Sequence, residues 1–174
     1  MLRSDYTATL SLIEMAEKLC EPLKNDKEGL SRESDELKEE FEALLRNVYF
    51  HRGALAHHIN KPQMALDNCT EFKRLLQEKL GSREDQSLGV AWNELGVAHL
   101  QNKDSKKSCE CFRISIAILE RLPGITPNAK SMPLINLGFG LWIAGQLDEA
   151  AAVFERTLAL REIAYGIDDT QSFA

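Results

Sequence analysis

Apolar residues recur at helical spacing along the whole chain, and short polar segments separate the apolar stretches. The first stretch covers residues 5–24, and a polar break at 25–29 follows it. A second predicted helix begins at Ser31 or Ser34 and runs to about Ile59. Recurrence every three to four residues is typical of amphipathic helices. The same spacing predicts five more helices, over residues 63–80, 87–101, 105–122, 128–144 and 147–163.

A fixed period lies within this pattern. The segment Trp92-Asn93-Glu94-Leu95-Gly96 recurs 42 positions later as Leu134-Ile135-Asn136-Leu137-Gly138. The same interval of 42 positions separates Ser108 from Ala150 and Phe112 from Phe154. A fainter copy lies 43 positions before the first segment and contains Tyr49, Gly53, Ala65 and Cys69. A constant period indicates an array of repeated helical hairpins, in which small residues let the two helices approach closely.

These residues resemble the tetratricopeptide repeat, which has an aromatic residue or Leu, then Leu-Gly, then Ala or Ser, then Phe. The period is longer than the ~34 residues usual in that family, and the extra length falls in residues 122–127. Repeats of 42 residues resemble those of kinesin light chains. The closing segment 161–170 resembles their inter-repeat loop and also the repeat tails of fungal proteins.

The resemblance implies an all-α fold, a right-handed α–α superhelix (solenoid) of antiparallel helical hairpins. Residues 1–45 are then an acidic N-terminal helical segment packed on the array. Residues 46–174 hold three repeats, at about 46–82, 89–123 and 131–166.

The resemblance also assigns the first helix of each hairpin to the concave surface of the array. An apolar groove of this kind suits a bound peptide or helix, with aromatic residues as anchors. Two alternatives are that the N-terminal helix or the twist of the array buries this stripe within the chain, and that the stripe forms a homodimer contact. The lining positions are Asn47, Phe50, Ala54, His57 and His58 in the first repeat, Val90, Asn93, Val97, Leu100 and Gln101 in the second, and Met132, Ile135, Phe139, Trp142 and Ile143 in the third.

A separate stripe packs the hairpins together, because its positions fall on another face of each helix. It consists of Trp92, Leu95, Phe112, Leu134, Leu137, Leu141 and Phe154. Relatives that grip the C-termini of chaperones hold the carboxylates with Lys, Asn and Arg on the first helices. The matching positions here include no Lys or Arg, which argues against that role: they are Phe50, Ala54, Asn93, Val97 and Ile135.

The charge is uneven along the chain. The net charge of the chain is −6, and all of it comes from the N-terminal segment. Residues 1–45 hold 12 acids and 6 bases, whereas residues 46–174 hold 15 acids and 15 bases. The repeats therefore lack the basic stripe that nucleic acid requires. No apolar run approaches the ~18–20 residues of a membrane helix. Acids within the first apolar stretch do not fit a signal peptide, so we expect a cytoplasmic protein with no membrane or nucleic-acid partner.

Candidate chemistry is sparse. Cys20, Cys69, Cys109 and Cys111 lack zinc spacing and fit packing positions. His51 and His58 share a helix face but are ~10.5 Å apart along the axis, too far to share a metal ion. No glycine-rich phosphate loop or nucleophile elbow is present. We therefore expect no catalytic residue, metal or cofactor.

The sequence as a whole predicts a protein–protein interaction scaffold or adaptor that holds a peptide or helix in the apolar groove. Two alternatives stay open. The repeats could be a homo-oligomerising or sensing tail of a larger system. Alternatively, Phe139, Trp142 and the histidines could surround a small-molecule pocket or an enzyme site.

Overall fold

The computed structural model describes residues 11, 14–15, 18 and 35–165, and every regular element in this part of the chain is helical. The expected all-α fold is therefore confirmed. Most of the helix predicted over residues 5–24 lies outside the described residues, as do residues 166–174. The expectation that residues 1–45 pack on the array stays a prediction.

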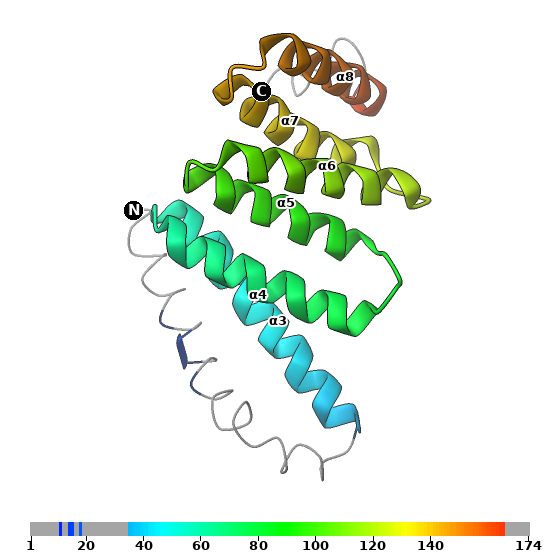
Figure 1. The fold of residues 1–174 in the computed structure, drawn as a ribbon. Helices are drawn as coiled ribbons and strands as arrows, with labels where there is room; N and C mark the ends of the chain where they lie inside the picture. The colour runs from blue at the N-terminus through cyan, green and yellow to red at the C-terminus, as the bar shows by residue number, and fades with distance from the viewer. Residues whose placement is uncertain (1–10, 12–13, 16–17, 19–34, 166–174) are drawn as a thin grey trace. The chain divides into compact units, whose positions relative to one another are not determined.

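Six helices follow one another in the described part of the chain (Figure 1). Those from residue 62 onward begin and end within two residues of their predicted bounds, because their apolar periodicity is strong and polar turns separate them. The helices are α3 (Asp35–His58), α4 (Pro62–Leu80), α5 (Gln86–Gln101), α6 (Ser105–Arg121), α7 (Pro127–Ile143) and α8 (Leu147–Tyr165).

The chain divides into two compact units, residues 1–78 and 79–174. In the first unit, α3 and α4 form a hairpin closed by Asn60, whose φ of 55° is left-handed, and by Pro62 at the start of α4. A Cβ atom on Gly53 would lie 2.9 Å from the Sγ of Cys69. The two helices therefore approach closely where the repeat pattern places a glycine.

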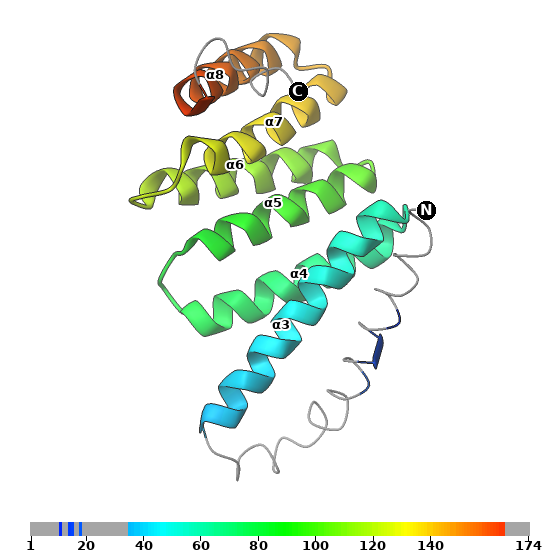
Figure 2. The same cartoon turned by 180° about the vertical axis from the view of Figure 1, so that it is seen from behind.

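The second unit contains two hairpins, α5–α6 and α7–α8, which stack through contact between α6 and α7. Side-chain caps fix where the first three of these helices begin. The backbone N–H of Leu88 donates to Asp85, that of Lys107 to Asp104 and that of Ala129 to Thr126. Each cap satisfies an N–H that has no partner within its helix. The two views in Figures 1 and 2 show α5 to α8 in chain order as successive layers of this unit.

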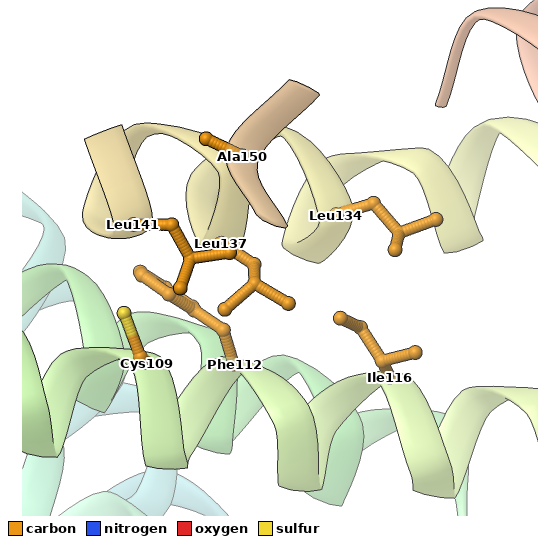
Figure 3. Packing of buried hydrophobic residues seen from close by; sticks show 7 residues of the cluster. All are labelled: Cys109, Phe112, Ile116, Leu134, Leu137, Leu141 and Ala150. Carbon is orange, nitrogen blue, oxygen red and sulfur yellow. The ribbon is translucent and has the colours of Figure 1, made fainter. Parts of the chain in front are cut away.

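The core of the second unit lies between α6 and α7. Figure 3 shows side chains from α6 directed at leucines of α7. Val97, Val153, Phe154 and Leu160 pack against this cluster from its edges. Most of the predicted packing stripe is buried here, whereas Trp92 and Phe154 are half-buried. The buried cluster consists of Cys109, Phe112, Ile116, Leu134, Leu137, Leu141 and Ala150.

Cys109 and Cys111 point about 200° apart on α6, yet both are buried. The reason is that α6 packs against α5 on one side and α7 on another, so two of its faces are covered. Burial raises the pKa of the Cys109 thiol, which keeps it protonated near neutral pH. The prediction that these cysteines are packing residues agrees with their positions. Cys69 is also buried, and Cys20 lies outside the described residues.

Candidate functional site

One face of α7 carries a stripe of large, exposed apolar side chains. Met132 is 51% exposed, Phe139 47%, and Trp142 and Ile143 are each 59% exposed. We call these four residues the α7 stripe. On the opposite face of the same helix, Leu134, Leu137 and Leu141 are at most 4% exposed. The packing of those leucines fixes the helix orientation, so the structure leaves the α7 stripe outside the core.

A pocket of about 270 Å³ lies beside the α7 stripe, between α5, α6 and α7. Met132 belongs to both features, so the pocket adjoins the stripe at that residue. Of the lining residues, the sequence predicted only Val90, Asn93 and Met132 as part of the groove. The full lining is Gln86, Val90, Asn93, Glu94, Ser115, Leu119, Ala129, Met132 and Pro133.

A chain of amide hydrogen bonds organises the polar edge of the pocket. The Nδ2 of Asn136 on α7 donates to the Oδ1 of Asn93 on α5, at 2.9 Å. The Nδ2 of Asn93 in turn donates to the Oε1 of Glu94, at 3.1 Å. Asn93 is only 8% exposed. This residue, expected to contact a partner, therefore links the two hairpins and orients the Glu94 carboxylate at the pocket.

Pro133 gives the pocket wall an unusual backbone. It lies inside α7 and is fully buried, although proline lacks the N–H of a helical hydrogen bond. The carbonyl one turn earlier, that of Ala129, consequently loses its usual helical donor. Both residues line the pocket. Pro133 was not among the predicted groove residues, although a proline within a predicted helix is itself a signal of an unusual backbone.

The remaining predicted groove positions differ in exposure. In the second unit, Val97 is half-buried against the core cluster, while Leu100, Gln101 and Ile135 are also half-buried. In the first unit, Asn47 and His58 are exposed, and Phe50, Ala54 and His57 are half-buried. The ring of Phe50 contacts that of Phe72, with centroids 5.2 Å apart.

One Cys–His pair forms in the first unit. The Sγ of Cys69 lies 3.8 Å from the Nε2 of His57, but Cys69 is only 2% exposed, which denies a substrate access to the thiol. Among the described residues, no three His, Cys, Asp or Glu side chains gather closely enough to hold a metal ion. In the same part of the chain, no helix has both the length and the apolar character needed to cross a membrane.

The stacked antiparallel hairpins, with a small residue at each close approach, define a helical-repeat protein. Residues 87–163 match the sequence profile of the tetratricopeptide repeat. The matched segment spans α5 to α8, so this part of the chain is similar to tetratricopeptide repeats, as its resemblance implied. A comparison with curated proteins finds no match.

Among solved structures, the fold is similar to the crystal structure of BtubC (BKLC) from P. vanneervenii, with a TM-score of 0.70 and 22% sequence identity. The similarity covers 94% of this chain and 61% of that one, so this chain spans less than two thirds of the protein it resembles. At this identity the likeness shows the fold, which confirms the expected solenoid of helical hairpins. The resemblance to fungal repeat tails stays a prediction.

Proposed function

We propose that this protein is an interaction scaffold or adaptor whose α7 stripe binds a peptide or helix of a partner protein. Tetratricopeptide repeats are generally protein-interaction scaffolds, and folds of this kind are typically non-catalytic. The finer part of the proposal, the place of binding, rests on one observation. Phe139, Trp142 and Ile143 are about half exposed on a helix whose opposite face is almost fully buried.

The chemistry of the α7 stripe supports this role. Large aromatic side chains contribute most of the binding energy in protein interfaces, because they remove much apolar area from water with few rotatable bonds. The ring of Phe139 is held against that of Phe154 on α8, with centroids 5.5 Å apart. A partner would therefore meet a partly preorganised aromatic surface, which lowers the entropy lost on binding.

A library of random peptides displayed on phage provides the test. Peptides selected on the wild-type protein are measured again on Trp142→Ala, which is expected to weaken their binding by ~2 kcal/mol or more. Ile114→Ala is the matched control, because Ile114 is an exposed apolar residue on α6. Selected peptides that bind Trp142→Ala as tightly as the wild type would refute the proposal. Light scattering on both variants separates peptide binding from self-association through the same stripe.

A further inference from the structure

We propose that an exposed face of α8 binds a helical hairpin of a partner protein, whose first helix has the leucine spacing of α7 and whose second helix is basic. This goes beyond the proposed function, because it concerns a second surface. Leu147, Ala151, Phe154 and Leu158 recur at helical spacing on one face of α8, and we call them the α8 stripe. Leu147 is 59% exposed and Leu158 40%.

The α8 stripe repeats a surface of α6 that is already filled. On α6 the corresponding side chains are at most 7% exposed, because the leucines of α7 pack against them (Figure 3). On α8 they are half-buried or exposed, and no helix among the described residues covers them. The same interface is thus present twice in the second unit, once filled and once open. The corresponding positions, 42 residues apart, are Cys109 and Ala151, Phe112 and Phe154, and Ile116 and Leu158.

The two phenylalanines show what a covering helix contributes. Each ring packs on a glycine of its own hairpin, since a Cβ atom on Gly96 or Gly138 would lie 2.5 Å from it. The ring of Phe112 also approaches α7, where it lies 3.8 Å from a Cβ built on Gly140, and it is fully buried. The ring of Phe154 is only half-buried. A helix placed on α8 as α7 is placed on α6 would complete its burial.

The filled interface also specifies the chemistry of the first helix. On α7, leucines at positions i, i+3 and i+7 belong to the core shared with α6. Gly140, at i+6, permits a close approach, because a Cβ atom on it would lie 3.0 Å from the Sγ of Cys109. A helix that fits α8 therefore has apolar residues at the same spacing and a small residue at i+6. The α7 of a second copy cannot supply this face, since its own leucines are buried against α6.

Ion pairs specify the charge of the second helix. Two such pairs join α6 to α8, and they are Arg113 with Glu149 and Glu120 with Arg156. The residues of α8 that correspond to Arg113 and Glu120 are Glu155 and Glu162. α8 thus offers two carboxylates where α6 offers one charge of each sign. A second helix placed against α8 as α8 is placed against α6 would meet both carboxylates. Basic residues would form ion pairs there, whereas acidic residues would repel.

The test uses a synthetic peptide of residues 124–165, which contains the leucine pattern and a second helix. The peptide is made unchanged and with Glu149→Lys, because position 149 is the one that would meet Glu155. Each form is titrated into the ¹⁵N-labelled full chain while the amide signals of Ala151 and Leu158 are followed. The Glu149→Lys peptide is expected to half-saturate these shifts at a concentration about two- to fivefold lower than the unchanged peptide, the scale of an exposed ion pair. Added salt should reduce this preference.

Three variants of the full chain complete the design. Leu158→Lys should raise the half-saturating concentration by about tenfold or more, because it places a charge within the apolar contact. Ile163→Lys is the matched control: it makes the same change on α8 at a residue that is 74% exposed. Position 163 lies about 140° around the helix from position 158, so this variant should bind like the wild type. Glu155→Lys should reverse the order of the two peptides, since it reverses the charge that they meet.

Several results would overturn the proposal. They are α8 signals that move with neither peptide, equal binding by Leu158→Lys and Ile163→Lys, and an unchanged order of the peptides in Glu155→Lys. Because a free peptide can fold poorly, the Glu149→Lys segment is also joined to the C-terminus of the full chain by a flexible linker, which gives an effective concentration of about millimolar. Amide hydrogen exchange at Leu158 should then slow, and an unchanged rate would also count against the proposal.

Two further outcomes separate this surface from its neighbours. The ring of Phe154 contacts that of Phe139, so the α8 stripe adjoins the α7 stripe. Peptide binding that is lost in Trp142→Ala and kept in Leu158→Lys would place the hairpin on the α7 stripe and refute the proposal. So would light scattering that shows a dimer of the full chain which Leu158→Lys makes monomeric, since a second copy would then cover α8. Failure of the proposed function is read separately, from library peptides that bind regardless of Trp142→Ala.

Discussion

Gly96 and Phe112 face each other across the α5–α6 hairpin so closely that position 96 has no room for a side chain. A Cβ atom on Gly96 would lie 2.5 Å from the Phe112 ring. The same relationship recurs 42 positions later, where a Cβ on Gly138 would lie 2.5 Å from the ring of Phe154. The two rings differ in their surroundings, because Phe112 is fully buried and Phe154 is half-buried.

This difference predicts unequal effects of one substitution. Gly96→Ala should destabilise the protein by about 1–3 kcal/mol, because the buried Phe112 ring has no space into which to move. At Gly138 the Phe154 ring can shift towards solvent, and the gain in helix propensity of about 1 kcal/mol offsets the remaining strain. Gly138→Ala should therefore be close to neutral. Urea unfolding of both variants checks the prediction. Equal unfolding midpoints for Gly96→Ala and Gly138→Ala would contradict the difference between the Phe112 and Phe154 contacts.

Adjacent residues of α7 provide a second comparison. Leu141 is fully buried in the core cluster, whereas Trp142 is 59% exposed. Leu141→Ala should lower the free energy of unfolding by about 2–5 kcal/mol, because it opens a cavity. Trp142→Ala should change it by no more than about 0.5 kcal/mol, as is usual for surface positions. A large loss of stability in Trp142→Ala would mean that this side chain is core and not a binding surface.

Two buried serines on α6 should respond differently to the loss of a hydroxyl group. The Oγ of Ser115 donates to the backbone carbonyl of Gly89 at 2.7 Å. The Oγ of Ser108 is buried and has no hydrogen-bond partner among the described residues. Ser115→Ala should cost about 1 kcal/mol. Ser108→Ala should be neutral or stabilising by up to about 1 kcal/mol, since it removes an unsatisfied polar group. Ala150 occupies the same position one repeat later. In urea unfolding, the midpoint of Ser115→Ala should fall below that of the wild type, whereas the midpoint of Ser108→Ala should stay the same or rise.

The stability of the protein should depend on pH through His99. Burial lowers the pKa of His99 below its ordinary value of 6.5; Lys107 acts in the same direction, and Asp104 and Glu110 oppose it. The unfolded chain therefore binds this proton more readily than the folded protein as the pH falls through 6.5. The free energy of unfolding should decrease as the pH falls from about 7 towards 5. His99→Gln should flatten this decrease in urea unfolding curves recorded across that range. If the free energies of unfolding of the wild type and of His99→Gln decrease in parallel over this pH range, His99 does not cause the decrease.

The sequence alone predicted the helices and the contacts within each hairpin, because both depend on short-range periodicity. The spacing from Gly96 to Phe112, for example, places a small residue opposite a large one in any hairpin of this length. The sequence also predicted the apolar α7 stripe, because helical spacing places Phe139, Trp142 and Ile143 on a different face from the buried leucines.

The pocket was not predictable in the same way, because it depends on how one hairpin is placed on the next. Helical periodicity puts Asn93 on the inner face of α5 but does not show that Asn136 of α7 lies within hydrogen-bonding distance. Nor does it show that Leu119 of α6 and Pro133 of α7 line one cavity. The expectation that Asn93 contacts a partner stays a prediction, and the link that its amide makes between the two hairpins was not foreseen.

The 42-residue period has a consequence for how such an array can lengthen. On α6, the positions held by Cys109, Phe112 and Ile116 receive the leucines of α7. On α8, one repeat later, Ala151, Phe154 and Leu158 hold those same positions, and Ala151 and Leu158 are exposed. A duplicated copy of residues 124–165, inserted after α8, would keep the 42-residue period and bring leucines already suited to that surface. Because each repeat contacts only its neighbours, such a duplication would extend the protein without redesigning what precedes it.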